Sequence, residues 1–136
     1  MLFRSMASAA QRAIRVLVAN RPRLLRELVL TTLSDQPDIE VVGQAADEIE
    51  IPALIERTHP DFLFIAQEEP RRRPALCDVL LRRHPQLRII AVAPDQSRSV
   101  CYWASFNIHA TSFEASEDSI LETVRRRLES QEGTRP

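Results

Sequence analysis

The side chains that most often do chemistry in proteins are few in this chain and lie far apart. His59, His84 and His109 show no pair with the spacing of a metal-binding motif. Cys77 and Cys101 lack such spacing too, so we expect two small, buried, reduced side chains. No G-x-S-x-G segment marks a catalytic serine. Residue types alone leave Ser/His/Asp catalysis open, but no pattern supports it, so we expect a protein without enzymatic activity, metal or cofactor.

The absence of lysine and the scarcity of glycine exclude several kinds of site. All 18 basic residues are arginines, so lysine-dependent mechanisms, including Schiff bases and phosphate-loop lysines, are excluded. Gly43 and Gly133 are the only glycines, which excludes a glycine-rich nucleotide-binding loop. A formal net charge of −1 and a pI near 6.3 provide no general attraction to nucleic acid or anionic membranes. We therefore expect neither as a partner.

Length and composition predict one folded domain. The chain has 136 residues, 44% of them apolar, which is enough for one core. The first twelve residues lack the apolar stretch of a signal peptide, and no run is long enough to span a bilayer. We expect a cytoplasmic protein with an N-terminal extension at 1–13, a domain at 14–129 and a flexible C-terminal tail at 130–136.

The residues between these limits alternate between strand and helix patterns. Short apolar runs predict strands at about 14–19, 39–45, 62–66, 87–92 and 107–112. Apolar residues at helical spacing predict helices at about 22–33, 50–58, 73–83, 96–105 and 116–129. Five strands alternating with five helices, joined by short loops, predict an α/β fold with a parallel sheet covered on both faces.

Several segments resemble one family, the response-regulator receiver domains of the NarL/FixJ (LuxR-type) subfamily. The segments are IRVLVA at 14–19, LLREL at 24–28, PDIEVVGQAAD at 37–47, HPD at 59–61, RRHP at 82–85 and EAS at 114–116. The resemblance runs from about Ile14 to Leu128. It implies a flavodoxin/CheY-like, doubly wound, five-stranded parallel sheet with strand order 2-1-3-4-5 and five helices.

The resemblance also implies a chemistry, and this chain lacks its residues. The family phosphorylates an aspartate that ends the third strand. An acidic pair after the first strand holds Mg²⁺, a Thr or Ser ends the fourth strand and a Lys ends the fifth. The matching positions here are Asn20 and Arg21, Ala66, Ala93 and Phe113. The family resemblance therefore predicts a degenerate pocket, a pseudo-receiver, without nucleophile, metal site or phosphoryl clamp.

Other notable residues have simpler interpretations. The arginine runs at 71–73 and 125–127 are most simply solvated, locally balanced surface. Trp103 falls at helical spacing from Val100 and is predicted to be core. Tyr102 falls on another side of the predicted helix, so we expect Tyr102 or Phe106 to be exposed and to contribute to a protein interface.

Three functional hypotheses follow. The first is a phosphorylation-independent module that binds another signalling or regulatory protein, or a second copy of itself, in signal transduction or transcription regulation. The second is a small-molecule sensor whose ligand occupies the strand-end crevice, with Arg21 available for an anionic group. The third is an ordinary phosphorylated receiver, which would require Glu68 or Glu69 to accept the phosphoryl group.

Overall fold

The computed structural model describes residues 12–20, 22–67, 72–93, 98–105 and 108–133, with side chains through Arg126. Its strands within these residues are β1 (Ile14–Val18), β2 (Ile39–Gln44), β3 (Phe62–Ala66), β4 (Arg88–Val92), β5 (Arg98–Ala104) and β6 (Ile108–Glu114). Its helices are α2 (Arg23–Ser34), a short 3₁₀ turn η1 (Glu48–Glu50), α3 (Ile51–Thr58), α4 (Ala75–Arg83) and α5 (Glu117–Gly133).

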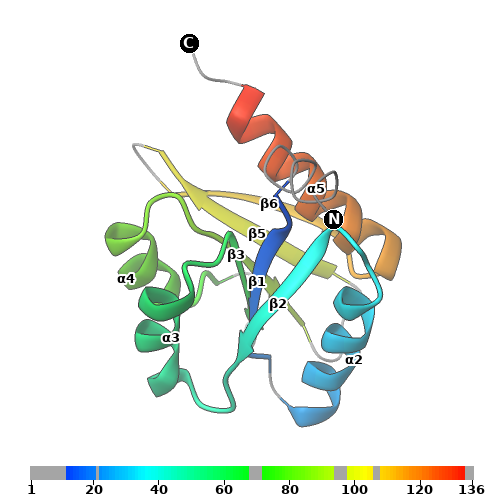
Figure 1. Ribbon diagram of the computed structural model, residues 1–136. Helices are drawn as coiled ribbons and strands as arrows, with labels where there is room; N and C mark the ends of the chain where they lie inside the picture. The colour runs from blue at the N-terminus through cyan, green and yellow to red at the C-terminus, as the bar shows by residue number, and fades with distance from the viewer. Residues whose placement is uncertain (1–11, 21, 68–71, 94–97, 106–107, 134–136) are drawn as a thin grey trace, which may run out of the picture.

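All six strands form one sheet, in the order β2-β1-β3-β4-β5-β6 (Figure 1). The pairs β1–β2, β1–β3 and β3–β4 are parallel. Strand β5 is antiparallel to both β4 and β6. The first four strands therefore have the arrangement expected of a doubly wound fold, and an antiparallel hairpin extends the sheet beyond them.

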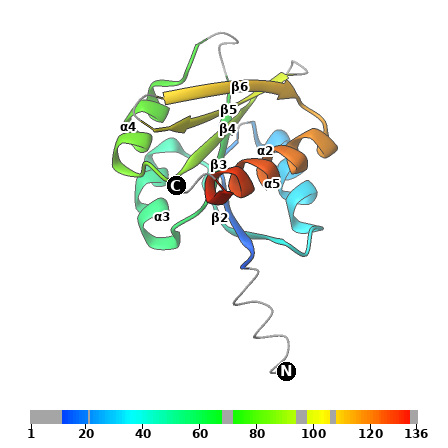
Figure 2. The same ribbon diagram turned by 90° about the horizontal axis from the view of Figure 1, so that it is seen from above.

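Helices cover the two faces of the sheet in pairs, with α3 and α4 on one face and α2 and α5 on the other (Figures 1 and 2). Each pair closes its own apolar core. Ile51 of α3 and Leu80 of α4 pack against Leu63 and Ile89. Val29 of α2 and Val124 of α5 pack against Phe64 and Ile90. The apolar runs of β3 and β4 are buried because both faces of these central strands are covered.

One predicted element is wrong. Residues 98–104 form strand β5, whereas we predicted a helix at about 96–105. The sheet therefore has six strands in place of five, and the described residues contain four α-helices in place of five. Val100, Tyr102 and Trp103 are β-branched or aromatic and fit a pleated, half-buried strand. The remaining alternation of strand and helix is as predicted, and the mostly parallel α/β class is confirmed.

Two further details bear on the predictions. Helix α5 continues through Gly133, past residue 130, where we expected the tail to begin. Arg125 of α5 binds Asp38 with nitrogen–oxygen distances of 2.7 and 2.9 Å, and this hydrogen bonding lowers the pKa of Asp38. Cys77 and Cys101 are buried and form no disulfide, as expected, although Cys101 lies on a strand. Among the described residues, no helix is long and apolar enough to cross a membrane.

Candidate functional site

The carboxyl ends of the three central strands meet at one edge of the sheet. The backbone N–H of Ala19 donates to the carbonyl of Phe64 at 2.8 Å, which joins the end of β1 to β3. Ala66 pairs with Val92, and the N–H of Gln67 donates to the carbonyl of Val92 at 2.9 Å. The structure thus brings together three of the expected site positions: Asn20, Ala66 and Ala93.

Asn20 is completely buried directly after β1. Its Nδ2 donates to the carbonyl of Ile65 at 2.8 Å, and its Oδ1 has no hydrogen-bond partner within the described chain. The amide therefore ties the end of β1 to β3 through its donor. A carboxylate at this position has no such donor, so this contact between β1 and β3 depends on the amide of Asn20.

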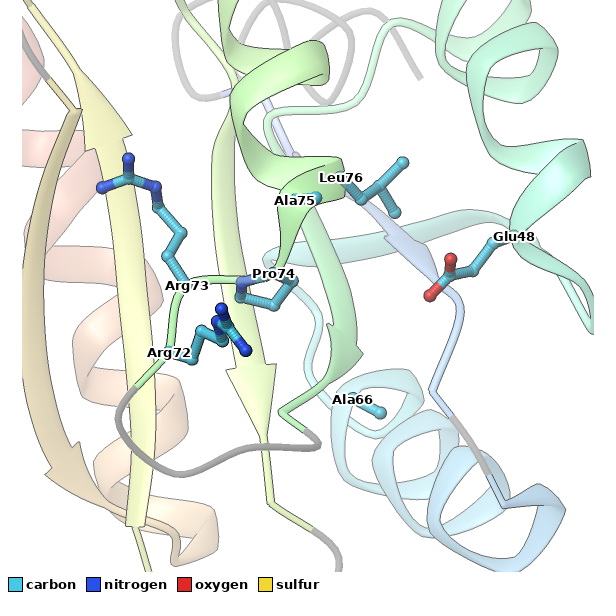
Figure 3. Close-up of a pocket in the computed structure, with 7 residues that line it drawn as sticks. All are labelled: Glu48, Ala66, Arg72, Arg73, Pro74, Ala75 and Leu76. Atoms are coloured by element: carbon cyan, nitrogen blue, oxygen red, sulfur yellow. The ribbon is translucent and has the colours of Figure 1, made fainter.

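Ala66 ends β3 and lies at a hollow of about 450 Å³ (Figure 3). The hollow is lined by Glu48, Ala66, Arg72, Arg73, Pro74, Ala75 and Leu76. Glu48 and Arg72 reach into it from opposite sides, while the Arg73 side chain turns away (Figure 3). Because Ala66 presents only a methyl group, the hollow has charged walls but no nucleophile at the strand end.

Arg73 is held by α4. Its Nε donates to Oδ1 of Asp78, in the first turn of that helix, at 2.6 Å. This hydrogen bond raises the pKa of Arg73 above its ordinary value. The Arg73 guanidinium therefore binds Asp78 on the side that turns away from the hollow, and Arg72 is the arginine that reaches into it (Figure 3). The arrangement can hold an anionic group but cannot form a covalent bond to it at Ala66.

Gln67 is a site residue that sequence reasoning missed. It is 3% exposed, its Nε2 donates to the carbonyl of Arg72 at 3.0 Å, and its Oε1 accepts from the hydroxyl of Tyr102 at 3.2 Å. It therefore links the end of β3 to β5 and to the start of the segment before α4. The sequence feature that could have indicated its role is its position: Gln67 is a polar residue directly after 62–66, the most apolar run of the chain.

The expected exposure of Tyr102 is wrong, because its ring is only 4% exposed on β5. Burial also raises the pKa of Tyr102. This ring belongs to the core under α3 and α4, which removes the reason for assigning it to an interface. Phe106, the other predicted interface residue, lies outside the described residues, as do Arg21, Glu68 and Glu69.

Phe113 does not join the crevice. It lies on β6 and pairs with Ser99 of β5, so β5 separates it from the end of β4. The inserted strand is the reason: it moves the last strand one place further from the centre of the sheet. The Phe113 ring packs against the core under α2 and α5. Phe113, which the resemblance matched to the family's lysine position, therefore lies one strand further from the centre of the sheet than we expected.

Ala93 lines a second, more apolar hollow of about 200 Å³ between α2 and α5. Its walls include Leu25, Leu28, Val29, Val92, Ala115 and Ile120. The residue is 6% exposed and offers no hydroxyl. Among the described residues, no cluster of three or more histidine, cysteine or acidic side chains could hold a metal ion.

Comparison with known proteins points to a receiver-type domain. No family model matches the chain. The chain is 41% identical over 58 residues to a protein-glutamate methylesterase/protein-glutamine glutaminase of Chromohalobacter salexigens, and 34% identical over 73 residues to one of Hydrogenovibrio crunogenus. These matches cover 43% and 53% of this chain but only 16% and 19% of those relatives, so the chain spans less than a fifth of their length.

The N-terminal part of these relatives is a receiver domain. The similarity therefore supports a receiver domain here, and with it a response-regulator-like signalling module. A similar match, 40% identity over 58 residues, is found with the methylesterase of Thiobacillus denitrificans. The sheet order β2-β1-β3-β4 and the two flanking helix layers agree with this class. The hairpin β5–β6 is where the structure departs from the fold that the resemblance implied.

Proposed function

We propose that this domain is a pseudo-receiver: a signalling module that works without phosphoryl transfer, by binding another regulatory protein or a second copy of itself. The observation that carries the proposal is the methyl group of Ala66 at the end of β3, beside the charged hollow. The proposal includes a place in the NarL/FixJ (LuxR-type) subfamily and a role in two-component signalling or transcription regulation. It assigns the domain no catalytic step and no cofactor.

Three further residues, Asn20, Ala93 and Phe113, support the proposal independently of one another. Phosphoryl transfer to a carboxylate needs the carboxylate, a divalent metal on hard oxygen ligands, and cationic or hydroxyl groups around the phosphoryl oxygens. Asn20 uses its amide on the Ile65 carbonyl, and Ala93 has no hydroxyl. Phe113 lies beyond β5. Each requirement is therefore lost at a separate residue, and no single substitution would restore the site.

Intact-mass spectrometry after incubation with acetyl phosphate and Mg²⁺ tests this. We expect no gain of a phosphoryl group by the wild-type chain or by Ala66→Asp, because the restored carboxylate would still lack metal ligands and a clamp. An ordinary receiver domain treated in parallel provides the positive control. Labelling of the wild-type chain, or of Ala66→Asp alone, would overturn the proposal. Peptide mapping would then show whether Glu68 or Glu69 carries the phosphoryl group.

A second function, sensing of an anionic small molecule, is favoured by the hollow beside Ala66. Its lining includes Arg72, whose side chain reaches into the hollow (Figure 3). Arg21, which we expected to bind the anion, lies outside the described residues. Thermal unfolding in the presence of a panel of phosphorylated and carboxylated metabolites tests the idea. A saturable stabilisation by one compound, lost in Arg72→Ala but kept in Arg82→Ala, would favour a sensor over a module that only binds proteins.

A further inference from the structure

Strand β6 forms one edge of the sheet (Figure 2). Within the described residues its strand partner is β5 alone, which pairs with all seven residues of β6 in an unbroken antiparallel register. The other side of β6 therefore presents backbone N–H and C=O groups along its whole length. Such an edge is a template on which another strand can pair.

The edge at β6 has none of the features that usually block such pairing. Residues 108–114, IHATSFE, contain no proline, lysine or bulge, and Glu114 at the end is the only acidic side chain. The opposite edge differs. The register of β2 against β1 shifts between Val16 and Leu17, and Glu40 lies near the start of β2. Bulges and charges are common protections of edge strands, so β2 is protected and β6 is open.

We propose that β6 pairs with β6 of a second copy of this chain, antiparallel and with Thr111 on the two-fold axis. The two sheets then become one continuous sheet of both protomers. In this register Thr111 faces Thr111 of the second copy, Ala110 faces Ser112, His109 faces Phe113 and Ile108 faces Glu114. Small and β-branched residues at the centre allow close approach of the two backbones.

Charge complementarity favours this occupant and this register. Ile108 packs on the side of the sheet that α4 covers, and alternation places Glu114 on the same side. Arg82 of α4 lines the same surface hollow as Ile108. The register therefore brings Glu114 of one copy next to Arg82 of the other, twice by symmetry. Both side chains are exposed, and neither makes an ion pair in the described chain, although Arg98 lies opposite Glu114 on β5.

The other side of the sheet offers a matching aromatic contact. The rings of Trp103 and His109 stack with centroids 5.2 Å apart, and His109 is exposed. In the proposed register Phe113 of the second copy lies opposite His109 and continues this row. Cross-strand aromatic and charge pairs are the interactions that stabilise an antiparallel pair. The inference rests on the proposed function in taking a second copy as the partner, but its test is separate, because the dimer depends on the sheet edge and not on the residues around Ala66.

Two opposite charges at the symmetry axis provide the sharpest test. Analytical ultracentrifugation over a concentration series should show a monomer–dimer equilibrium for the wild-type chain. Thr111→Lys alone and Thr111→Glu alone should each weaken the dimer about tenfold, because each puts like charges face to face. An equimolar mixture of the two variants should recover the dimer as a heterodimer. Circular dichroism and thermal unfolding of each variant check that the fold is kept.

A charge swap at the ends of the strand tests the register separately, should a charged side chain in place of Thr111 disturb the packing under α5. Glu114→Arg and Arg82→Glu should each weaken the dimer, and the double variant should restore it. Glu27→Arg, the same charge change on α2, is the matched control and should have no effect. A wild-type chain that stays monomeric at every concentration overturns the proposal. So does a dimer that survives the changes at Thr111 and Glu114, which would form through another surface.

Discussion

At the scale of single residues, two polar side chains at the strand ends make hydrogen bonds that join neighbouring strands. The side-chain amide of Asn20 donates to the Ile65 carbonyl. Gln67 accepts from the Tyr102 hydroxyl and so joins the end of β3 to β5. The resemblance alone predicted that Asn20, Ala66, Ala93 and Phe113 stand where the family carries its reactive residues. The partner of Gln67 could not be predicted, because Tyr102 lies 35 residues away and had been assigned to a helix.

Tyr102→Phe tests the value of this buried contact. The substitution removes the hydroxyl and leaves Oε1 of Gln67, a buried acceptor, with one hydrogen bond fewer. We expect the free energy of unfolding to fall by about 1 kcal/mol, the usual net contribution of one hydrogen bond. Denaturant unfolding measures this change. In Gln67→Leu/Tyr102→Phe the two losses should be less than additive, since they remove one interaction. Full additivity would mean that the two groups do not interact.

At the scale of elements, the sequence predicted the central strands and most helices but not β5. The runs that form β1, β3 and β4 are short, apolar and bounded by turns, a pattern typical of buried strands. The run Arg98–Ala104 is different. Its apolar residues are consecutive, and a short apolar run cannot be assigned to helix or strand by periodicity alone. Val100, Trp103 and Ala104 also fit helical spacing, which led us to predict a helix, whereas the segment forms a strand because it pairs with β4 and β6.

Disulfide trapping tests the hairpin directly. Val100 and Ser112 face one another across β5 and β6. Val100→Cys/Ser112→Cys should therefore form an intramolecular disulfide on mild oxidation, detected by mass spectrometry with and without reductant. Val100→Cys/Ala110→Cys is the matched control, because diagonal neighbours in a sheet are about 7–8 Å apart, too far for an unstrained bridge. Equal cross-linking of the two pairs, or none in the first, would contradict the strand assignment.

At the scale of the whole molecule, the added hairpin decides which site residues meet. Asn20, Ala66 and Ala93 gather at one edge because parallel strands end there together, and this follows from the predicted alternation of elements. Phe113 does not join them, because β5 lies between β4 and β6. The meeting of these three residues could therefore be predicted from the sequence, but the complete geometry of the strand-end edge could not, since the strand order depends on one misassigned element.

Because the thiol of Cys77 is buried, we expect the domain to lose stability as the pH rises through the alkaline range. Burial raises its pKa from 9.0 to about 12, so the folded state holds the proton more strongly than the unfolded state does. This contribution is fully present below pH 9 and is lost as the pH rises toward 12. A shift of this size corresponds to a loss of about 4 kcal/mol at most.

Urea unfolding between neutral pH and about pH 11 measures this dependence. Cys77→Ala should be less stable at neutral pH because of the small cavity it leaves, but its stability should fall less steeply as the pH rises. The quantity to compare is the slope of the free energy of unfolding against pH, and not the stability at one pH. Identical slopes for the wild-type chain and Cys77→Ala would contradict the assignment of this effect to the thiol.

The most direct test of the central claim is an amide NMR titration of the intact chain with Mg²⁺ and then with Mg²⁺ and beryllofluoride, a phosphoryl mimic. It reports on the three residues that end β1, β3 and β4 individually. If this receiver-type domain has lost its phosphorylation site, the amide signals of Asn20, Ala66 and Ala93 should keep their positions throughout both titrations. Saturable shifts concentrated on these three residues would show a working metal and phosphoryl site, and would contradict the pseudo-receiver account.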